Sequence, residues 1–259
     1  MYKIFFFLFL SLISIEAKEK TVQAVGMGIS YISLPEYIGS SNQQQFLLPY
    51  PYIYYKSEKL TIKKNKISNH LYKKANQAID ISFSGTVPVK CDKDSLRYGM
   101  IDLDPTFEVG PNFIHKLYKF EDKKSYINIE FPVRTVWAVN LKHIRSIGYN
   151  FSPNIYLKYF YSDNLTMSFS SGPTFATSKY NDYFYAVNNE SVNNSREEFN
   201  SSGGYTGLKN SIVFSYEKDK LIMSSFLRYY DLENVKFENS PLVSKKNAFF
   251  YGMFLSYVF

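Results

Sequence analysis

The chain has 259 residues, a formal net charge of +7 and an aromatic content of 19%, with 24 Tyr and 23 Phe. This aromatic content is far above ordinary use, and a mean hydropathy of −0.24 excludes a bundle of membrane-spanning helices. A single cysteine excludes an intrachain disulfide framework. Rings at this density are typical of a transmembrane β-barrel, where they form two girdles at the membrane interfaces.

The first residues resemble a secretory signal. In MYKIFFFLFLSLISIEAKEK, Lys3 precedes an apolar run, and Ala17 precedes a charged stretch. The run is about half of the ~20 residues that a spanning helix needs, so we expect cleavage rather than anchoring. We therefore divide the chain into a cleaved signal, residues 1–17, and one barrel domain, residues 18–259, exported by a Sec-type route. Export argues against nucleic acid as a partner and favours anionic lipopolysaccharide head groups for the positive charge.

Beyond the signal, segments of about ten residues alternate in hydrophobicity and end at polar breaks. We predict about twelve strands, at residues 21–33, 45–56, 59–64, 67–73, 78–86, 104–118, 125–137, 147–160, 165–178, 204–217, 221–231 and 248–259. Short breaks alternate mostly with long ones, at residues 34–44, 87–103, 138–146, 179–203 and 232–247. Bacterial barrels combine short periplasmic turns, long external loops and an even strand number. We therefore expect an all-β, antiparallel up-and-down barrel with both termini in the periplasm.

The alternation assigns one face of each strand to lipid and the other to the interior. In YINIEFPVRTVW, for example, Phe131 and Val133 share the lipid face, while Glu130 and Arg134 share the interior face. The chain ends inside its last strand, AFFYGMFLSYVF, with three large side chains of one parity: Phe259, Tyr257 and Leu255. We expect these three residues to close the barrel against the first strand. An aromatic end of this kind resembles the signal read by the outer-membrane barrel assembly machinery.

Charged residues of both signs are predicted in the interior: Asp80, Glu108, Glu130, Arg134, Lys158, Lys209 and Arg228. Glu108 and Glu130, on adjacent strands, are the candidates for paired acid and base catalysts. We favour a charge-neutralised interior instead, in which Glu130 and Arg134 satisfy each other, with a structural or gating role.

Neither catalysis nor metal binding is expected. His115 falls on a lipid-facing parity but lacks the Ser and acid of a lipase triad. Asp102, Asp104 and Glu108 in IDLDPTFE supply hard oxygens for Ca²⁺, but the segment lacks a glycine-turned loop with ligands at alternate positions. We interpret it as an acidic strand entry and predict no enzyme activity, no metal site and no cofactor.

Several motifs recur in an order that resembles the MipA/OmpV family of outer-membrane proteins: GMIDLDPTFEVGP, FPVR, SGPTFA, YFYAV, GGYTG, ENSPLV and the early YISLPEYIGSSNQQQFLLPYPYIYYK. The resemblance covers essentially the whole mature chain. It implies a non-catalytic barrel in the outer membrane of a Gram-negative bacterium. The name-giving member is a scaffold that joins a peptidoglycan lytic transglycosylase to a peptidoglycan synthase, so the resemblance also implies these partners.

Two other functions stay open at this point. Small interior residues leave a path for a narrow pore: Ala24, Gly26, Gly28, Ser168, Ser170 and Gly172. Loop aromatics suit a surface adhesin: Tyr180, Tyr183, Phe184 and Tyr185. For these rings we favour packing on the barrel rim over exposure.

Overall fold

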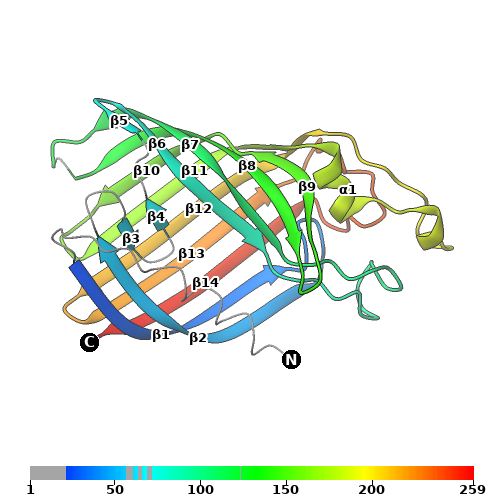
Figure 1. Ribbon diagram of the computed structural model, residues 1–259, viewed down its shortest axis with the longest axis horizontal. Coiled ribbons are helices and arrows are strands. Elements are labelled where there is room, and N and C mark those ends of the chain that lie inside the picture. Colours follow the sequence, from blue (N-terminus) through cyan, green and yellow to red (C-terminus); the bar gives the residue numbers. More distant parts are fainter. Residues whose placement is uncertain (1–21, 57–60, 64–65, 69–71, 123) are drawn as a thin grey trace.

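The chain folds almost entirely into antiparallel strands (Figure 1). The computed structural model describes residues 22–56, 61–63, 66–68, 72–122 and 124–259, and the expected signal, residues 1–17, lies outside them. The longer strands are β1 (Val22–Pro35), β2 (Gln43–Lys56), β6 (Gln77–Thr86), β7 (Thr106–Lys119), β8 (Tyr126–Val139), β9 (Ile144–Phe151), β10 (Asn154–Phe160), β11 (Leu165–Ala176), β12 (Gly204–Lys218), β13 (Leu221–Asp231) and β14 (Asn247–Val258). Three strands are short: β3 (Thr61–Lys63), β4 (Lys66–Ser68) and β5 (Tyr72–Lys74).

Two helices lie in one loop between β11 and β12. They are α1 (Ser178–Tyr185) and the 3-10 helix η1 (Asn189–Ser191). No helix within the described residues is long and apolar enough to cross a membrane.

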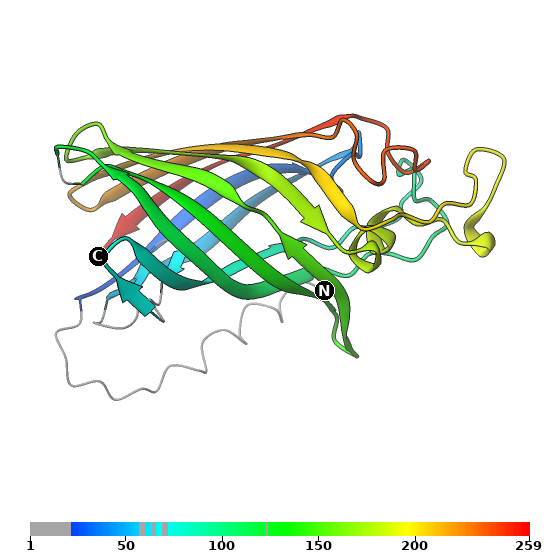
Figure 2. The ribbon, with the colours of Figure 1, turned by 90° about the horizontal axis from the view of Figure 1, so that it is seen from above.

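The strands wrap into a cylinder, with their axes steeply tilted (Figure 2). Strands next to one another in the chain pair along most of the sheet, and β1 also pairs with β14 from Gly26 opposite Val258 to Ser33 opposite Tyr251. The first and last strands of the described chain are therefore joined. The hydrogen-bonded path runs from β4 through β1, β14 and β8 to β5, and β4 contacts β6 across the remaining seam.

The predicted fold class, an antiparallel barrel of about twelve strands, is confirmed. Strand structure falls within each of the twelve predicted segments, but the segment predicted at 67–73 holds parts of two strands, β4 and β5, and its residues 69–71 lie outside the described part of the chain. The segment predicted at 147–160 begins earlier, at Ile144, and is divided into β9 and β10 by Ser152 and Pro153. Proline has no N–H to offer the ladder, so a break at this point is expected.

Alternation separates the two faces as the sequence indicated. Exposed apolar side chains form a belt around the outside, including Met27, Ile29, Phe131, Val133, Ile155, Phe169, Phe214, Met253 and Leu255. The intervening positions are buried and largely polar, as at Asn128 and Arg134 in β8. An apolar outside around a polar inside is the arrangement of a transmembrane barrel.

The two ends of the barrel differ. The first strand starts and the last strand finishes at the end that carries the short turns, where the Phe259 N–H donates to the Val25 carbonyl at 3.0 Å. Helix α1 and the long loops lie at the opposite end (Figure 1). This separation of short and long connections agrees with the topology predicted from the breaks.

Candidate functional site: the charged interior and the loop-filled mouth

Arg134 is the centre of a hydrogen-bond network inside the barrel. Its Nε donates to Glu108 Oε2 at 2.9 Å, and Nη1 donates to Ser82 Oγ at 3.0 Å. Its Nη2 donates to Asn150 Oδ1 and to Ser152 Oγ, both at 3.1 Å. The guanidinium is therefore bound by groups from β6, β7, β9 and the residue after β9. A buried charge neutralised by a carboxylate and satisfied by neutral oxygens is stable inside a narrow barrel.

The predicted pairing of Glu130 with Arg134 is wrong, because Glu108 is the carboxylate that pairs with Arg134. Glu130 and Arg134 are four residues apart on one strand, which separates their backbones by roughly 13 Å. Glu108 lies opposite Val136 on the neighbouring strand, so it reaches Arg134 diagonally.

Glu108 and Glu130 are also too far apart to act as a catalytic pair. Glu130 lies opposite Ile114, and Ile114 is six residues along β7 from Glu108. This spacing corresponds to roughly 20 Å of extended chain. The fold therefore places Glu108 next to Arg134 and keeps Glu108 apart from Glu130.

The other predicted interior charges lie on inward-facing positions of their strands. Asp80 is buried opposite Asn112, and the Lys158 ammonium lies 5.0 Å from the centre of the Phe160 ring. The Arg228 guanidinium lies 5.9 Å from the centre of the Phe250 ring. Lys209 lies within electrostatic range of Glu108, Glu130, Arg134 and Arg228. The interior charges of both signs thus interact across the bore.

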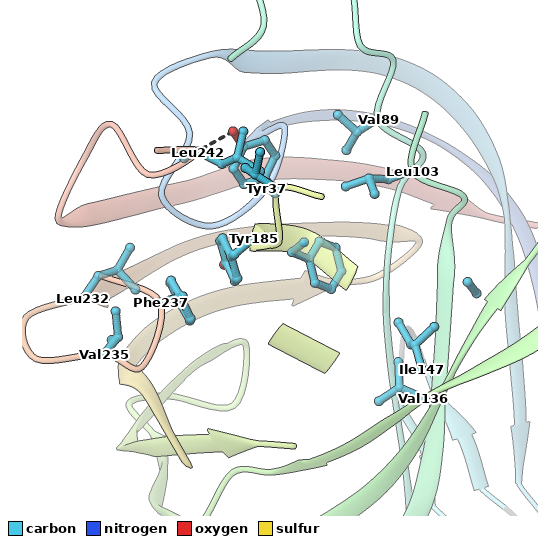
Figure 3. Packing of buried hydrophobic residues seen from close by; sticks show 13 residues of the cluster. Tyr37, Val89, Leu103, Val136, Ile147, Tyr185, Leu232, Val235, Phe237 and Leu242 are labelled. Atoms are coloured by element: carbon cyan, nitrogen blue, oxygen red, sulfur yellow. Dashed lines mark hydrogen bonds between the residues drawn. The ribbon is translucent and has the colours of Figure 1, made fainter. Parts of the chain in front are cut away.

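The mouth at the long-loop end is filled by a hydrophobic cluster, which we call the cap (Figure 3). The Tyr185 ring stacks on Phe237 with their centres 3.7 Å apart and their planes at 8°. The buried members of the cap are Tyr37, Val89, Leu103, Val136, Ala138, Ile147, Phe184, Tyr185, Val187, Leu232, Val235, Phe237 and Leu242. They come from four long loops and from the adjoining ends of β8 and β9, so the loops pack on one another.

Hydrogen bonds between loops hold the cap together. The Tyr37 hydroxyl donates to the Leu242 carbonyl at 2.8 Å, and the Tyr185 hydroxyl donates to the Ile38 carbonyl at 2.9 Å. Arg97, which is also buried, donates to the Phe184 carbonyl at 2.7 Å. Because each bond joins segments far apart in the chain, the cap is a defined structure.

Helix α1 connects the cap to the Arg134 network. Gly148, at φ +115°, leaves no room for a side chain, because a Cβ there would lie 2.1 Å from Thr177 Oγ1. This close approach seats the start of α1 on β9, where Thr177 Oγ1 accepts the Tyr149 N–H at 3.1 Å. Burial first, and then the Glu108 carboxylate, raise the pKa of the Tyr180 phenol. Tyr180 therefore lies within electrostatic range of the Arg134 network.

The loop aromatics pack inward, as we favoured from the sequence. Phe184 and Tyr185 are buried in the cap, and Tyr180 and Tyr183 are partly buried against it. Tyr183 also donates its hydroxyl proton to the Asp104 carbonyl at 2.9 Å. These rings therefore stabilise the mouth, and little of their surface is left for contact with another cell.

The small interior residue Gly28 does not leave open space. The Tyr50 ring lies over it, because a Cβ on Gly28 would be 2.5 Å from that ring, and the Tyr50 hydroxyl is 2.5 Å from Ser256 Oγ. Gly172 similarly faces the Pro153 carbonyl oxygen, which would lie 2.0 Å from a Cβ. At both positions glycine permits a close approach, and the predicted path along the first strand is narrowed by Tyr50.

The three carboxylates of IDLDPTFE that we considered as calcium ligands each bond a different protein group. Asp102 accepts the Cys91 N–H at 2.8 Å, and Asp104 accepts the Asn140 side-chain amide at 3.0 Å. Glu108 pairs with Arg134. Within the part of the chain that the structure describes, three or more His, Cys, Asp or Glu side chains nowhere gather as a metal site would require.

The short-turn end forms a continuous hydrogen-bonded edge, which we call the rim. Lys124 in the turn after β7 bonds Asp163 in the turn after β10 at 2.9 Å. The Asn164 carbonyl accepts the Glu217 N–H at 2.9 Å, and the Lys220 carbonyl accepts the Val258 N–H at 2.8 Å. Together with the bond from Phe259 to Val25, these contacts link the turns from β7 round to β1. A recess of about 280 Å³ opens beside the rim, lined by Ala24, Tyr52, Tyr54, Glu217, Asp219, Ile222 and Val258.

Residues 25–259 match the family model described as MltA-interacting protein MipA. Among solved structures, the chain is 8% identical to a NanC porin, covering 91% of this chain and 98% of that one at a TM-score of 0.38. It is also 8% identical to the Ralstonia pickettii toluene transporter TbuX, covering 94% of this chain and 70% of that one at a TM-score of 0.28. No curated protein matches the chain closely enough to count as a relative.

Proposed function

Because the chain belongs to the MltA-interacting protein family, we propose that it is a non-catalytic outer-membrane scaffold that holds peptidoglycan-remodelling enzymes through its rim. The partner class is a peptidoglycan lytic transglycosylase, together with a peptidoglycan synthase. The observation that carries the proposal is the rim itself, a linked set of turns at the end where the described chain begins and finishes.

The rim has the rigidity and the chemistry that a docking surface needs. Asp122 accepts hydrogen bonds from the backbone N–H groups of Lys124 and Ser125, at 2.9 and 2.8 Å, and also bonds the Ser125 hydroxyl. Tyr161 is 74% exposed in the adjoining turn. A preorganised surface loses little entropy on binding, and exposed Tyr is typical of interface hot spots. Single turns are small, so the linked rim and the adjoining recess together supply the contact area.

The rest of the molecule supports membrane anchoring. The apolar belt contacts lipid, and exposed Lys90, Lys93 and Lys142 lie at the long-loop end, where the outer leaflet carries anionic lipopolysaccharide. In this orientation the rim faces the periplasm of a Gram-negative bacterium, where peptidoglycan lies. The packed cap and the neutralised Arg134 network favour a closed anchor over a porin-like channel.

Site-specific photocrosslinking in cells tests the docking role. A crosslinker at Tyr161 on the rim is expected to capture a lytic transglycosylase or a synthase, identified by mass spectrometry. The matched control site is Leu141, which is 82% exposed at the long-loop end and is expected to capture neither enzyme. Failure to capture a peptidoglycan enzyme from Tyr161, or equal capture from Leu141, would overturn the proposal.

A further inference from the structure

Three buried oxygen atoms on β7 and β8 lack a hydrogen-bond partner among the described residues. They are Asn112 Oδ1, Asn128 Oδ1 and Glu130 Oε1. Asn112 and Asn128 are each only 7% exposed. Buried acceptors are nearly always satisfied in native proteins, so an unpartnered group indicates a bound ligand or an ordered water.

The three oxygens gather on one side of the bore. The Asn112 amide nitrogen lies 3.4 Å from Glu130 Oε2, and Asn112 is opposite Pro132, two residues along β8 from Glu130. Asn128 is two residues from Glu130 in the other direction, so all three side chains share the inward face. We call this set the acceptor wall. A second carboxylate, Asp80, is buried opposite Asn112 on the neighbouring strand, so two acidic side chains adjoin this wall.

Donors lie on a different part of the bore. Arg228 on β13 has a buried Nε without a hydrogen-bond partner among the described residues. Lys209 on β12 lies opposite Tyr230, two residues along β13 from Arg228, and within electrostatic range of both Arg228 and Glu130. We call Lys209 and Arg228 the donor wall. Arg134 and Glu108 neutralise each other, so neither adds a free charge to either wall.

The geometry points to a binding site for a small zwitterion, such as an amino acid or a dipeptide, between the acceptor wall and the donor wall. The ligand's ammonium group donates to Glu130 and the two asparagine oxygens, and its carboxylate accepts from Arg228 and Lys209. A simple anion would gain the donor wall but face the Glu130 carboxylate, and a simple cation would face the Arg228 guanidinium. Only a ligand with both charges complements both walls.

This inference goes beyond the docking role, because the site lies inside the barrel and needs no protein partner. A barrel that binds no small ligand would not contradict docking at the rim. A rim that gives no crosslinks would not contradict ligand binding inside the barrel. The two proposals are therefore tested separately.

Isothermal titration calorimetry on the intact barrel in detergent micelles tests the site. Glycylglycine is the probe, and acetate and ethylammonium are controls that each carry one of its charges. We expect saturable heat with glycylglycine and none with either control at the same concentration. Equal binding of a single-charge control, or no heat with glycylglycine, would overturn the proposal and assign the unpartnered oxygens to water.

Two conservative variants locate the binding. Glu130→Gln and Arg228→Gln each remove one charged contact and are expected to weaken glycylglycine binding about tenfold or more. Glu190→Gln, at an exposed residue of η1, is the matched control and is expected to bind as the unaltered barrel does. Unchanged affinity in both interior variants would contradict the site. If neither variant folds, the comparison of the three probes on the unaltered barrel decides.

Discussion

Arg134 donates from Nε to Glu108 Oε2 at 2.9 Å across neighbouring strands, and both side chains are less than a tenth exposed. The pair adjoins the cap, because Glu108 lies opposite Val136, a buried member of the cap. The two charges thus neutralise each other inside the barrel at the level where the cap begins.

Removing one member of this pair is expected to destabilise the barrel. Glu108→Gln leaves the Arg134 charge buried without its carboxylate, and breaking a buried pair typically costs about 3 kcal/mol or more. The loss is measured as a lower free energy of unfolding by denaturant in lipid vesicles. Lys124→Gln breaks an exposed, solvent-screened pair instead and is expected to leave the free energy of unfolding nearly unchanged. Equal stability of Glu108→Gln and the unaltered barrel would show that the interior charge is solvated.

The double variant Glu108→Gln with Arg134→Met separates charge from packing. It removes both charges, so it is expected to recover part of the stability that Glu108→Gln loses. If the double variant loses more unfolding free energy than Glu108→Gln and Arg134→Met lose together, pairing of the two charges is not the cause of the stabilisation.

The cap predicts an electrically silent barrel. In a planar bilayer, the unaltered protein is expected to show no stable single-channel conductance, because α1 and the loops fill the mouth above the Arg134 network. Replacing residues 178–201 by a short Gly-Ser linker is expected to produce conductance. The matched control is Ile101→Ala, at a loop residue that is 88% exposed, and it should stay silent. Stable conductance of the unaltered protein would favour a function as a narrow pore over a function as a closed scaffold.

The sequence predicted which side chains face lipid, because strand alternation assigns Phe131 and Val133 to one face and Arg134 to the other without knowledge of the neighbours. It did not predict that Glu108 is the partner of Arg134. That choice depends on the register between β7 and β8, which a bulge between Lys116 and Tyr118 shifts.

Local sequence patterns also did not predict the cap. Its contacts join residues as distant in the chain as Tyr37 and Leu242, which hydrophobic periodicity does not relate. Helix α1 has only eight residues, too few for a helical period to stand out among loop aromatics. The sequence favoured packing of the loop rings on the barrel over exposure. That these rings share one core with residues of other loops is visible only in the three-dimensional structure.

Acid is expected to loosen the rim. Hydrogen bonds from Ser125 lower the pKa of the Asp122 carboxyl from its ordinary value of 3.8. A depressed folded pKa contributes stability above the unfolded pKa, and the contribution is lost as pH falls through the folded value. The protection factor of the Ser125 amide, which is the exchange rate of an unstructured amide divided by its own rate at the same pH, should therefore be high at neutral pH and fall as the pH drops through the lowered pKa of Asp122. Ser125→Ala is expected to return the Asp122 pKa toward 3.8, as measured by side-chain carboxyl NMR. An unchanged pKa in that variant would contradict the assignment of the shift to Ser125.

The terminal Phe259 is expected to matter more for assembly in cells than for the stability of the finished barrel. Its N–H donates to the Val25 carbonyl, and its ring is 70% exposed on the lipid face with Tyr257 and Leu255. Loss of one peripheral hydrogen bond costs only about 1 kcal/mol, so purified protein lacking Phe259 should still refold into a heat-modifiable barrel. In cells, the same deletion is expected to reduce the amount of inserted barrel several-fold if, as we predict from the sequence, the assembly machinery reads this aromatic end as its signal. Phe249→Ala, on the same face at the other end of β14, is the matched control and should insert normally. Equal insertion of the protein lacking Phe259 would remove that role and leave the residue only its bond to β1.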